Sequence, residues 1–392
     1  MSAVIPCCRI LLGCVLAAVL SPVYASTVTV RCGSTPLPGE YASIGAALAE
    51  LSPDGPHTIS VEGICNERVL IYDRKNLTLT AIDPNAAIQG TAGPVVDVQR
   101  SHSITVFGLG ISGGAARPVL ARVMHGTAVM FNHCRFEHGS GGVVSSIGAQ
   151  ATAYNSSFDD ITGVALTAAD GGSLSISNNV TVRNSGGAVS AGYHSYVGIA
   201  TPFLAEDLTG IAVGASGGTV RITSSASAPA TIQRAGQGFL SQLGGVVVIS
   251  TPVTVSDCKT YGVQNLGHFI VATTGSLIVR NNAQDGIFVV SGGSLQLNHA
   301  EISGNGGHGV TLERNANAAV FDSTISGNAG SGIVVSHASV LALINSTVNS
   351  NSDKDLICNT DSHAYGDKAG VGKMSCPGFS APSGPKPKPI EE

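Results

Sequence analysis

The sequence predicts an all-β, single-domain, three-sided parallel solenoid with roughly twelve coils. Ten consecutive segments begin between Gly126 and Ala338 at intervals of 22 to 27 residues, and each combines a small-residue turn with short apolar runs and a Gly-rich corner. Within the runs apolar residues alternate with period two, as Leu295 and Leu297 do, which indicates strands rather than helices. Runs this short can each form one side of a coil that stacks on the next.

Asn and Asp recur at matching places in the repeats. One series lies near the seventh or eighth residue of six repeats: Asn132, Asn155, Asn178, Asn298, Asp322 and Asn345. A second, partial series contains Asn305, Asn328 and Asn351. We expect stacked Asn side chains to hydrogen-bond from coil to coil, and we interpret them as turn scaffolding rather than as glycan contacts.

The two ends of the solenoid need covers, because open sheet edges aggregate. Residues 41–51 predict a capping helix with Ile44, Leu48 and Leu51 on one face. The predicted organisation is therefore a signal peptide, an N-terminal strand with the capping helix, the β-helix, and a C-terminal capping segment with a disordered tail, over residues 1–25, 26–60, 61–360 and 361–392.

The N-terminus favours export. Arg9, the apolar stretch of residues 10–20 and a small-residue site ending at Ala25 are typical of a signal peptide, which predicts a secreted or periplasmic protein. A lipobox ending at Cys14 is the alternative, less favoured because it would leave a very short apolar region. No later segment is apolar enough to span a bilayer.

The amino-acid composition limits the classes of partner that we expect. A net charge of -5 with 11% charged residues offers no basic face, so we expect no nucleic-acid partner. The 43% of hydrophobic residues excludes a disordered chain. The capped ends argue against end-to-end fibres, and we expect a monomer.

Six cysteines remain after signal removal, and an exported protein permits disulfides. Cys32 with Cys65 would tie the first edge, and Cys358 with Cys376 the last, while Cys134 and Cys258 are expected to be free and buried. Spacing alone does not fix this connectivity. No CxxC pair is present, so we expect neither a metal nor a cofactor.

The stretch from Ile44 to Leu79, IGAALAELSPDGPHTISVEGICNERVLIYDRKNLTL, resembles the pectin-lyase-like right-handed parallel β-helix superfamily when taken with the repeats that follow. The resemblance covers residues 28–360 and implies a right-handed coil. Members of this superfamily include pectate and alginate lyases, polygalacturonases, epimerases, tailspikes and surface proteins, so the resemblance implies a fold without choosing an activity.

The signatures of the enzymes in that superfamily are not matched. Asp159-Asp160 and Gly307-His308-Gly309 lie several coils apart, which rejects a polygalacturonase-like site. Asp83-Pro84-Asn85 lacks the histidine of an epimerase-like Asp-Pro-His. No cluster of three carboxylates supports a calcium site.

Two weaker constellations remain. The first stacks Glu137, Asp159 and Arg183 at one corner of successive coils, with a second row beside them: His138, Asp160 and Asn184. Close carboxylates next to an Arg are the groups that cleavage of an acidic polymer requires, so Glu137, Asp159, Asp160 and Arg183 are the catalytic candidates and His138 a substrate-binding candidate. An ordinary solvated turn is the alternative.

The second constellation lies on the outer face of the following strand in later coils. It places in one row Gln242, Gln264, Phe288 and Thr311, with Glu313 and Arg314 at the edge. An exposed Phe flanked by amides suits a sugar face, so we take these residues, with Glu313, as substrate-binding candidates. A plain exposed sheet is the alternative.

The sequence therefore predicts an exported β-helix protein that interacts with extracellular or envelope polysaccharide, with catalysis undecided. The alternatives are a non-catalytic envelope or adhesion rod, and a lyase or glycoside hydrolase acting on an acidic polymer. The low aromatic content, 5% without Trp, and the unmatched enzyme signatures weigh against a carbohydrate-active protein, whereas the low charge and sparse outward chemistry fit the non-catalytic rod better.

Overall fold

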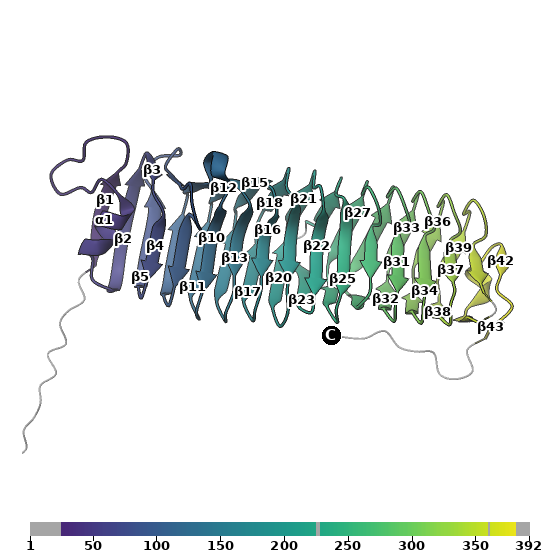
Figure 1. Ribbon diagram of the computed structural model, residues 1–392. Coiled ribbons are helices and arrows are strands. Elements are labelled where there is room, and N and C mark those ends of the chain that lie inside the picture. Colours follow the sequence, from purple (N-terminus) through teal and green to yellow (C-terminus); the bar gives the residue numbers. More distant parts are fainter. Residues whose placement is uncertain (1–24, 225–227, 360, 382–392) are drawn as a thin grey trace, which may run out of the picture.

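Three parallel β-sheets run along one elongated rod in the computed structural model, which describes residues 25–224, 228–359 and 361–381 (Figure 1). The predicted signal peptide, its lipobox alternative and most of the expected tail lie outside these ranges. Within them, no helix is long and apolar enough to cross a membrane.

Sheet A holds sixteen of the described strands, namely β1 (Ser26–Arg31), β2 (Asp54–Glu62), β5 (Lys75–Ala81), β8 (His102–Phe107), β11 (Ala128–Asn132), β14 (Gln150–Tyr154), β17 (Ser173–Ser177), β20 (Tyr196–Thr201), β23 (Thr219–Ser224), β26 (Val246–Ile249), β29 (His268–Val271), β32 (Ser294–Asn298), β35 (Asn317–Phe321), β38 (Val340–Ile344), β41 (His363–Gly366) and β43 (Phe379–Ser380).

Sheet B holds thirteen of the described strands, namely β3 (Ile64–Asn66), β6 (Ala87–Gln89), β9 (Gly110–Ser112), β12 (Arg135–Gly139), β15 (Ser157–Ile161), β18 (Val180–Arg183), β21 (Phe203–Glu206), β24 (Ala230–Gln233), β27 (Pro252–Ser256), β30 (Ser276–Arg280), β33 (Ala300–Ser303), β36 (Thr324–Ser326) and β39 (Thr347–Asn349).

Sheet C holds fourteen of the described strands, namely β4 (Val69–Tyr72), β7 (Val96–Gln99), β10 (Val119–Met124), β13 (Gly141–Ser145), β16 (Val164–Ala168), β19 (Gly187–Ala191), β22 (Ile211–Ser216), β25 (Gln237–Gln242), β28 (Val263–Asn265), β31 (Ile287–Val290), β34 (Val310–Glu313), β37 (Ile333–Val335), β40 (Leu356–Cys358) and β42 (Met374–Ser375).

From β2 to β40, each coil contributes one strand to each sheet in the order A, B, C, and every paired strand is parallel to its neighbour, as between β11 and β14. The predicted all-β, three-sided solenoid is therefore confirmed. Inward side chains from all three sheets form one continuous apolar cluster that extends from Val30 to Ala364. Successive side chains of a strand point alternately into the core and out to solvent. The outward side chains of stacked strands therefore form straight rows along the rod, with one residue per coil about 4.8 Å from the next.

The first Asn series marks a corner rather than a hydrogen-bonded ladder. Asn155, Asn178, Asp322 and Asn345 occupy the left-handed region between sheets A and B, with φ between 46° and 53°. Asn and Asp tolerate this conformation better than most residues. Asn132 and Asn298 instead end their strands, and a His follows each of them at the corner. In the described part of the chain, no side-chain hydrogen bond joins one member of this series to the next, so that part of the prediction is wrong.

The second series is the hydrogen-bonded ladder, and it is longer than predicted. Nδ2 of Asn282 donates to Oδ1 of Asn305, 2.9 Å away, and the same bond repeats onward to Asn328, Asn351 and the carboxylate of Asp355. The five side chains are buried. Each Asn oxygen also accepts from a backbone N–H of the coil before it, and Oδ1 of Asp355 accepts from the N–H of Asn351 in the same corner, so the ladder holds a buried corner together.

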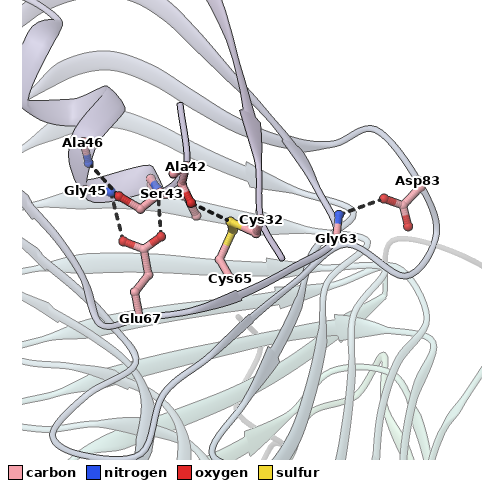
Figure 2. The surroundings of a disulfide bond; sticks show 10 residues. Cys32, Ala42, Ser43, Gly45, Ala46, Gly63, Cys65, Glu67 and Asp83 are labelled. Carbon is pink, nitrogen blue, oxygen red and sulfur yellow. Dashed lines mark hydrogen bonds between the residues drawn. A yellow bond between two sulfur atoms is a disulfide. The ribbon is translucent and has the colours of Figure 1, made fainter. Parts of the chain in front are cut away.

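A short helix covers the first coil. α1 (Ile44–Glu50) begins after Ser43, whose Oγ accepts from the N–H of Ala46 at 3.1 Å (Figure 2). Ile44 and Leu48 point into the core as predicted. At the other end of α1, Nη1 of Arg74 donates to the carbonyl oxygen of Leu51 at 2.6 Å.

Disulfides close both ends of the rod. Cys32 bonds to Cys65 beside α1 (Figure 2), and Cys358 bonds to Cys376 at the far end, so both predicted pairs are confirmed. Cys134 and Cys258 are free and buried, also as predicted. The last coil carries the 3₁₀ turn η2 (Lys368–Gly370).

Candidate functional site

The predicted stack at the end of the sheet B strands is present. Glu137 of β12 lies opposite Asp159 of β15, which lies opposite Arg183 of β18. The inward neighbours keep the same register, and the rings of Phe136 and Phe158 stack with centroids 4.6 Å apart. The predicted register is confirmed, whereas the catalytic roles of these residues stay predictions.

The neighbouring row forms the corner that follows sheet B. His138, Asp160 and Asn184 have φ of 58°, 53° and 49°. His, Asn and Asp are the side chains that this conformation favours after Gly. The corner geometry therefore explains part of the residue choice without any ligand.

Arg183 is committed to a charge network further along sheet B. Its Nε lies 2.6 Å from Oε1 of Glu206, the next residue in its row. Oε2 of Glu206 accepts from Arg234 at 2.8 Å and from Gln233 at 2.6 Å. These hydrogen bonds, that from Gln233 first, hold the pKa of Glu206 below its usual value.

Asp160 is held by a loop from an earlier coil. The 3₁₀ turn η1 (Gly114–Ala116) is followed by Arg117, whose Nη1 and Nη2 donate to the two oxygens of Asp160 at 2.8 and 2.6 Å. These bonds hold the pKa of Asp160 below its usual value. A carboxyl that stays ionised at neutral pH is a poor proton donor, which favours a structural role for Asp160. His138 lies at the edge of this pair, with Nε2 3.7 Å from Oδ2 of Asp160.

The second constellation is partly assembled on sheet C. Gln264 of β28 lies opposite Phe288 of β31, which lies opposite Thr311 of β34. Gln242 does not belong to this row, so that prediction is wrong: Leu240 lies opposite Gln264. Gln242 lies two residues further along β25 and donates from Nε2 to Oγ of Ser216 at 2.9 Å.

A tyrosine that the sequence analysis missed completes this surface. The ring of Tyr261 stacks on that of Phe288, with centroids 5.1 Å apart and planes 16° apart, and both rings are half-buried. Tyr261 lies in the corner before β28, outside the strand pattern, so periodicity alone could not place it. Burial, and then the charges of Asp285 and Glu313, raise the pKa of the Tyr261 hydroxyl.

The polar residues beside the rings are linked to one another. Oδ2 of Asp285 accepts from Oγ1 of Thr311 at 2.7 Å, and Oδ1 accepts from the N–H of His308 at 2.8 Å. Nδ1 of His308 accepts from the N–H of Ser331 at 2.8 Å, so the proton of the neutral ring lies on Nε2. His308 thus holds a turn in place through its backbone and its ring. Glu313 lies at the edge of this surface, with Oε1 3.4 Å from Nδ1 of His337.

We call this surface the sheet C platform; it consists of Tyr261, Gln264, Asp285, Phe288, Thr311 and Glu313. It offers two stacked aromatic rings, an amide and two carboxylates on successive coils. Aromatic faces bind the C–H faces of rings, while amides and carboxylates bind hydroxyl groups. The arrangement is suited to binding a sugar chain.

One group of potential metal ligands lies elsewhere. Cys32, Cys65 and Glu67 have ligand atoms within 4.8 Å of one another, near α1 (Figure 2). Both sulfurs belong to the disulfide, and the carboxylate of Glu67 accepts from the N–H of Ile44 at 2.7 Å and of Gly45 at 3.0 Å. These residues stabilise the cap and do not fit a metal ion, because the thiolates that would bind it are oxidised.

Comparison with known proteins agrees with the fold. The family described as "Right handed beta helix region" matches residues 209–368, and the resemblance expected from the sequence is confirmed for the fold and its handedness. No curated protein matches this sequence.

Several solved structures are similar over most of the chain. A point variant of the periplasmic alginate epimerase AlgG is 13% identical, with 85% of this chain and 79% of that chain covered and a TM-score of 0.49. The A-module of the mannuronan C-5 epimerase AlgE6 of Azotobacter vinelandii is 10% identical, with coverage of 87% and 92% and a TM-score of 0.38. The catalytic domain of a GH87 alpha-1,3-glucanase in complex with tetrasaccharides is 11% identical, with coverage of 89% and 69% and a TM-score of 0.41. At these identities the likeness concerns the fold alone.

Proposed function

Because the chain folds as a right-handed parallel β-helix of the pectin-lyase-like type, we propose that it is a polysaccharide-binding protein that holds a sugar chain across the sheet C platform. The observation that carries the proposal is the stacked, half-exposed pair of Tyr261 and Phe288 in register with Gln264 and Thr311. Half-exposed aromatic rings bordered by hydrogen-bonding groups suit a pyranose, which has C–H faces and hydroxyl edges.

The charges of the platform favour a neutral polymer over a polyanion. Asp285 and Glu313 are both close enough to act on the Tyr261 hydroxyl, and both are carboxylates. Ionised carboxylates accept hydrogen bonds from sugar hydroxyls but repel a uronate. We therefore propose a neutral, hydroxyl-rich polysaccharide as the ligand.

The platform spans three successive coils, from β28 to β34. Gln264, Phe288 and Thr311 lie in one row, so the two outer residues are about 10 Å apart at the usual strand spacing. An extended chain lying along this row meets a new side chain at each coil, which suits a polymer better than a single sugar.

Export belongs to the same proposal. Two disulfides close the ends of the rod, and disulfides persist outside the reducing cytosol. The signal peptide expected from residues 1–25 supplies the route. A secreted or periplasmic protein would meet polysaccharide in its own compartment.

The contacts at the sheet B corner favour a protein that binds polysaccharide without cleaving it. Of the four catalytic candidates, Arg183 is paired with Glu206 and Asp160 with Arg117. Asp159 accepts a hydrogen bond from Asn184 at 2.8 Å. Cleavage by two carboxylates requires one that donates a proton, and Asp160, whose pKa is lowered by its hydrogen bonds from Arg117, is a poor donor.

The test is binding of residues 26–392 to a panel of soluble β-glucan, α-glucan, mannan, pectate and alginate, measured by affinity electrophoresis and calorimetry. Phe288→Ala is expected to weaken neutral-glycan binding about tenfold or more, because stacking of this kind contributes about 1–3 kcal/mol. Tyr196→Ala, which removes an exposed ring from sheet A, is the matched control and should bind as wild type.

Two results would overturn the proposal. One is unchanged binding by Phe288→Ala, and the other is preference for pectate or alginate over every neutral polymer. The same samples are analysed by mass spectrometry for products. Shortened or unsaturated chains that disappear with Glu137→Gln or Asp159→Asn would establish the enzymatic alternative instead.

A further inference from the structure

A hollow lies on the outer face of sheet B in the first coils, away from the sheet C platform. It measures about 420 Å³ and crosses β3, β6, β9 and β12. Its floor consists of small side chains, Ala87, Gly110 and Ser112. The hollow exists because these small residues lie between larger ones in the same outward rows.

Opposite charges lie at one end of this hollow. Arg135 and Glu137 both point outward from β12, two residues apart, and both line the hollow. A β-carbon at position 110 would lie 3.3 Å from Nη2 of Arg135, so glycine there allows the guanidinium to extend over the floor. At the other end are the half-exposed Ile64 and the amides of Asn85 and Gln89.

The two charges are not used by the fold. Further along sheet B, two arginines are balanced by two carboxylates: Arg183 and Arg234 both pair with Glu206, and Arg234 also pairs with Asp207. By contrast, in the described ranges of the chain the side chains of Arg135 and Glu137 make no ion pair or hydrogen bond, not even with each other. Both charges therefore remain available to a ligand in the hollow that they line.

We propose that this hollow binds a small zwitterion of the α-amino acid type, free or at the end of a peptide. The ligand carboxylate pairs with the guanidinium of Arg135, and its ammonium pairs with the carboxylate of Glu137. Charge-assisted hydrogen bonds of this kind are short and are stronger than neutral ones. Ile64 then offers an apolar contact for an aliphatic side chain.

Charge balance excludes simpler ligands. An anion would pair with Arg135 but would lie beside the unpaired Glu137, and a cation would meet the reverse problem. A phosphate dianion fits worse, because the residues lining the hollow include one cation and one carboxylate. A neutral sugar would leave both charges partly desolvated and unpaired, which costs free energy. A zwitterion satisfies both.

The test uses calorimetry and ¹H–¹⁵N spectra of residues 26–392 titrated with L- and D-leucine. N-acetyl-leucine, which lacks the ammonium, and leucinamide, which lacks the carboxylate, are the matched ligands. We expect saturable binding of leucine at one site, and binding of each derivative at least tenfold weaker. Arg135→Gln and Glu137→Gln should each weaken leucine binding by a similar factor.

Controls separate the site from the fold. Arg280→Gln removes an exposed Arg from the same sheet far from the hollow and should bind as wild type. Ala87→Phe fills the floor without changing charge and should abolish binding. The proposal is overturned if no saturable binding occurs, if the derivatives bind as well as leucine, or if Arg135→Gln binds as wild type. Because Phe288→Ala acts on the other sheet, it should leave leucine binding unchanged, so the two sites are tested independently.

Discussion

The side-chain Nδ2 of Asn305 donates to Oδ1 of Asn328, 2.9 Å away, and the backbone N–H of Asn305 donates to the same oxygen at 3.1 Å. The same two bonds join Asn328 to Asn351 one coil later. Each amide is buried, so each oxygen satisfies two donors that no water can reach. The ladder is therefore a stability element that runs along the inside of a corner.

Asn328→Ala should destabilise the protein by about 2–3 kcal/mol, because it leaves the buried donors of Asn305 without an acceptor. The measurement is urea unfolding followed by circular dichroism. Asn349→Ala, an exposed Asn on the neighbouring strand, is the control and should change the free energy of unfolding by less than about 0.5 kcal/mol. Equal effects of the two substitutions would show that the ladder contributes nothing specific.

Asp97 should make stability depend on pH. Its side chain is buried on sheet C and accepts from Arg122 at 2.7 Å and Arg68 at 2.6 Å. Burial alone would raise the pKa of Asp97, but the hydrogen bonds from Arg122, Gln99 and Arg68 outweigh burial and lower it. A carboxyl with a lowered pKa in the folded protein stabilises above its unfolded pKa of about 3.9, and that stabilisation is lost as pH falls through the folded pKa.

Asp97→Asn should therefore cost about 2 kcal/mol at pH 6, and the difference from wild type should shrink as pH falls below about 4. Thermal unfolding from pH 6 to pH 2.5 measures this. Asp73→Asn, which changes an exposed carboxylate paired with Arg100 at 3.0 Å, should have a small effect at every pH. A difference between wild type and Asp97→Asn that stays constant with pH would contradict the proposed ionisation.

The ion pair between Arg117 and Asp160 should control a loop rather than global stability. Both side chains are more than a third exposed, so Asp160→Asn should change the free energy of unfolding by about 1 kcal/mol or less. Hydrogen exchange of residues 113–118 should nevertheless become faster, because the loop loses its contact with the later coil. Asp207→Asn, which occupies the same corner position but pairs with Arg234, should leave that exchange unchanged. Unaltered exchange in Asp160→Asn would mean that the loop is held by other contacts.

The cysteines should divide into two chemical classes. Burial raises the pKa of the Cys134 thiol to about 12 and that of Cys258 to about 11, so iodoacetamide at pH 8 should modify neither in the native protein. In denaturant without reductant, mass spectrometry should find both modified and the four disulfide cysteines unmodified. Rapid labelling of either thiol under native conditions would show that its coil opens readily.

The fold was predictable because apolar and polar residues alternate within each strand. The register between coils was predictable only where a large inward residue marked the equivalent position in each coil. Phe136 and Phe158 provide such a marker, and the outward stack of Glu137 and Asp159 followed correctly. Gln242 was placed in the wrong row because coil lengths differ at the corners, which shifts positions counted from the repeat start. Leu240 is the residue that lies opposite Gln264.

The parts of the candidate sites that escaped the sequence lie outside the strands. Tyr261 belongs to a corner, where no periodicity applies, and only its contact with Phe288 shows its place. Arg117 and Asp160 are 43 residues apart and meet because a loop leans over the next coils. Such contacts depend on the path of loops, which local patterns do not specify.

One coil in this part of the rod is 23 residues long, as the interval between Asn282, Asn305, Asn328 and Asn351 shows. The length of the rod can therefore change only by whole coils. A duplicated segment of that length would carry its own rung of the ladder and one strand for every sheet, and would move the C-terminal end by about 4.8 Å. An insertion or deletion shorter than a coil would instead shift the Asn side chains out of register and break their hydrogen bonds. Gain or loss of entire coils thus gives evolution a way to change the length of this molecule in discrete steps while the sheet C platform and the sheet B hollow stay as they are.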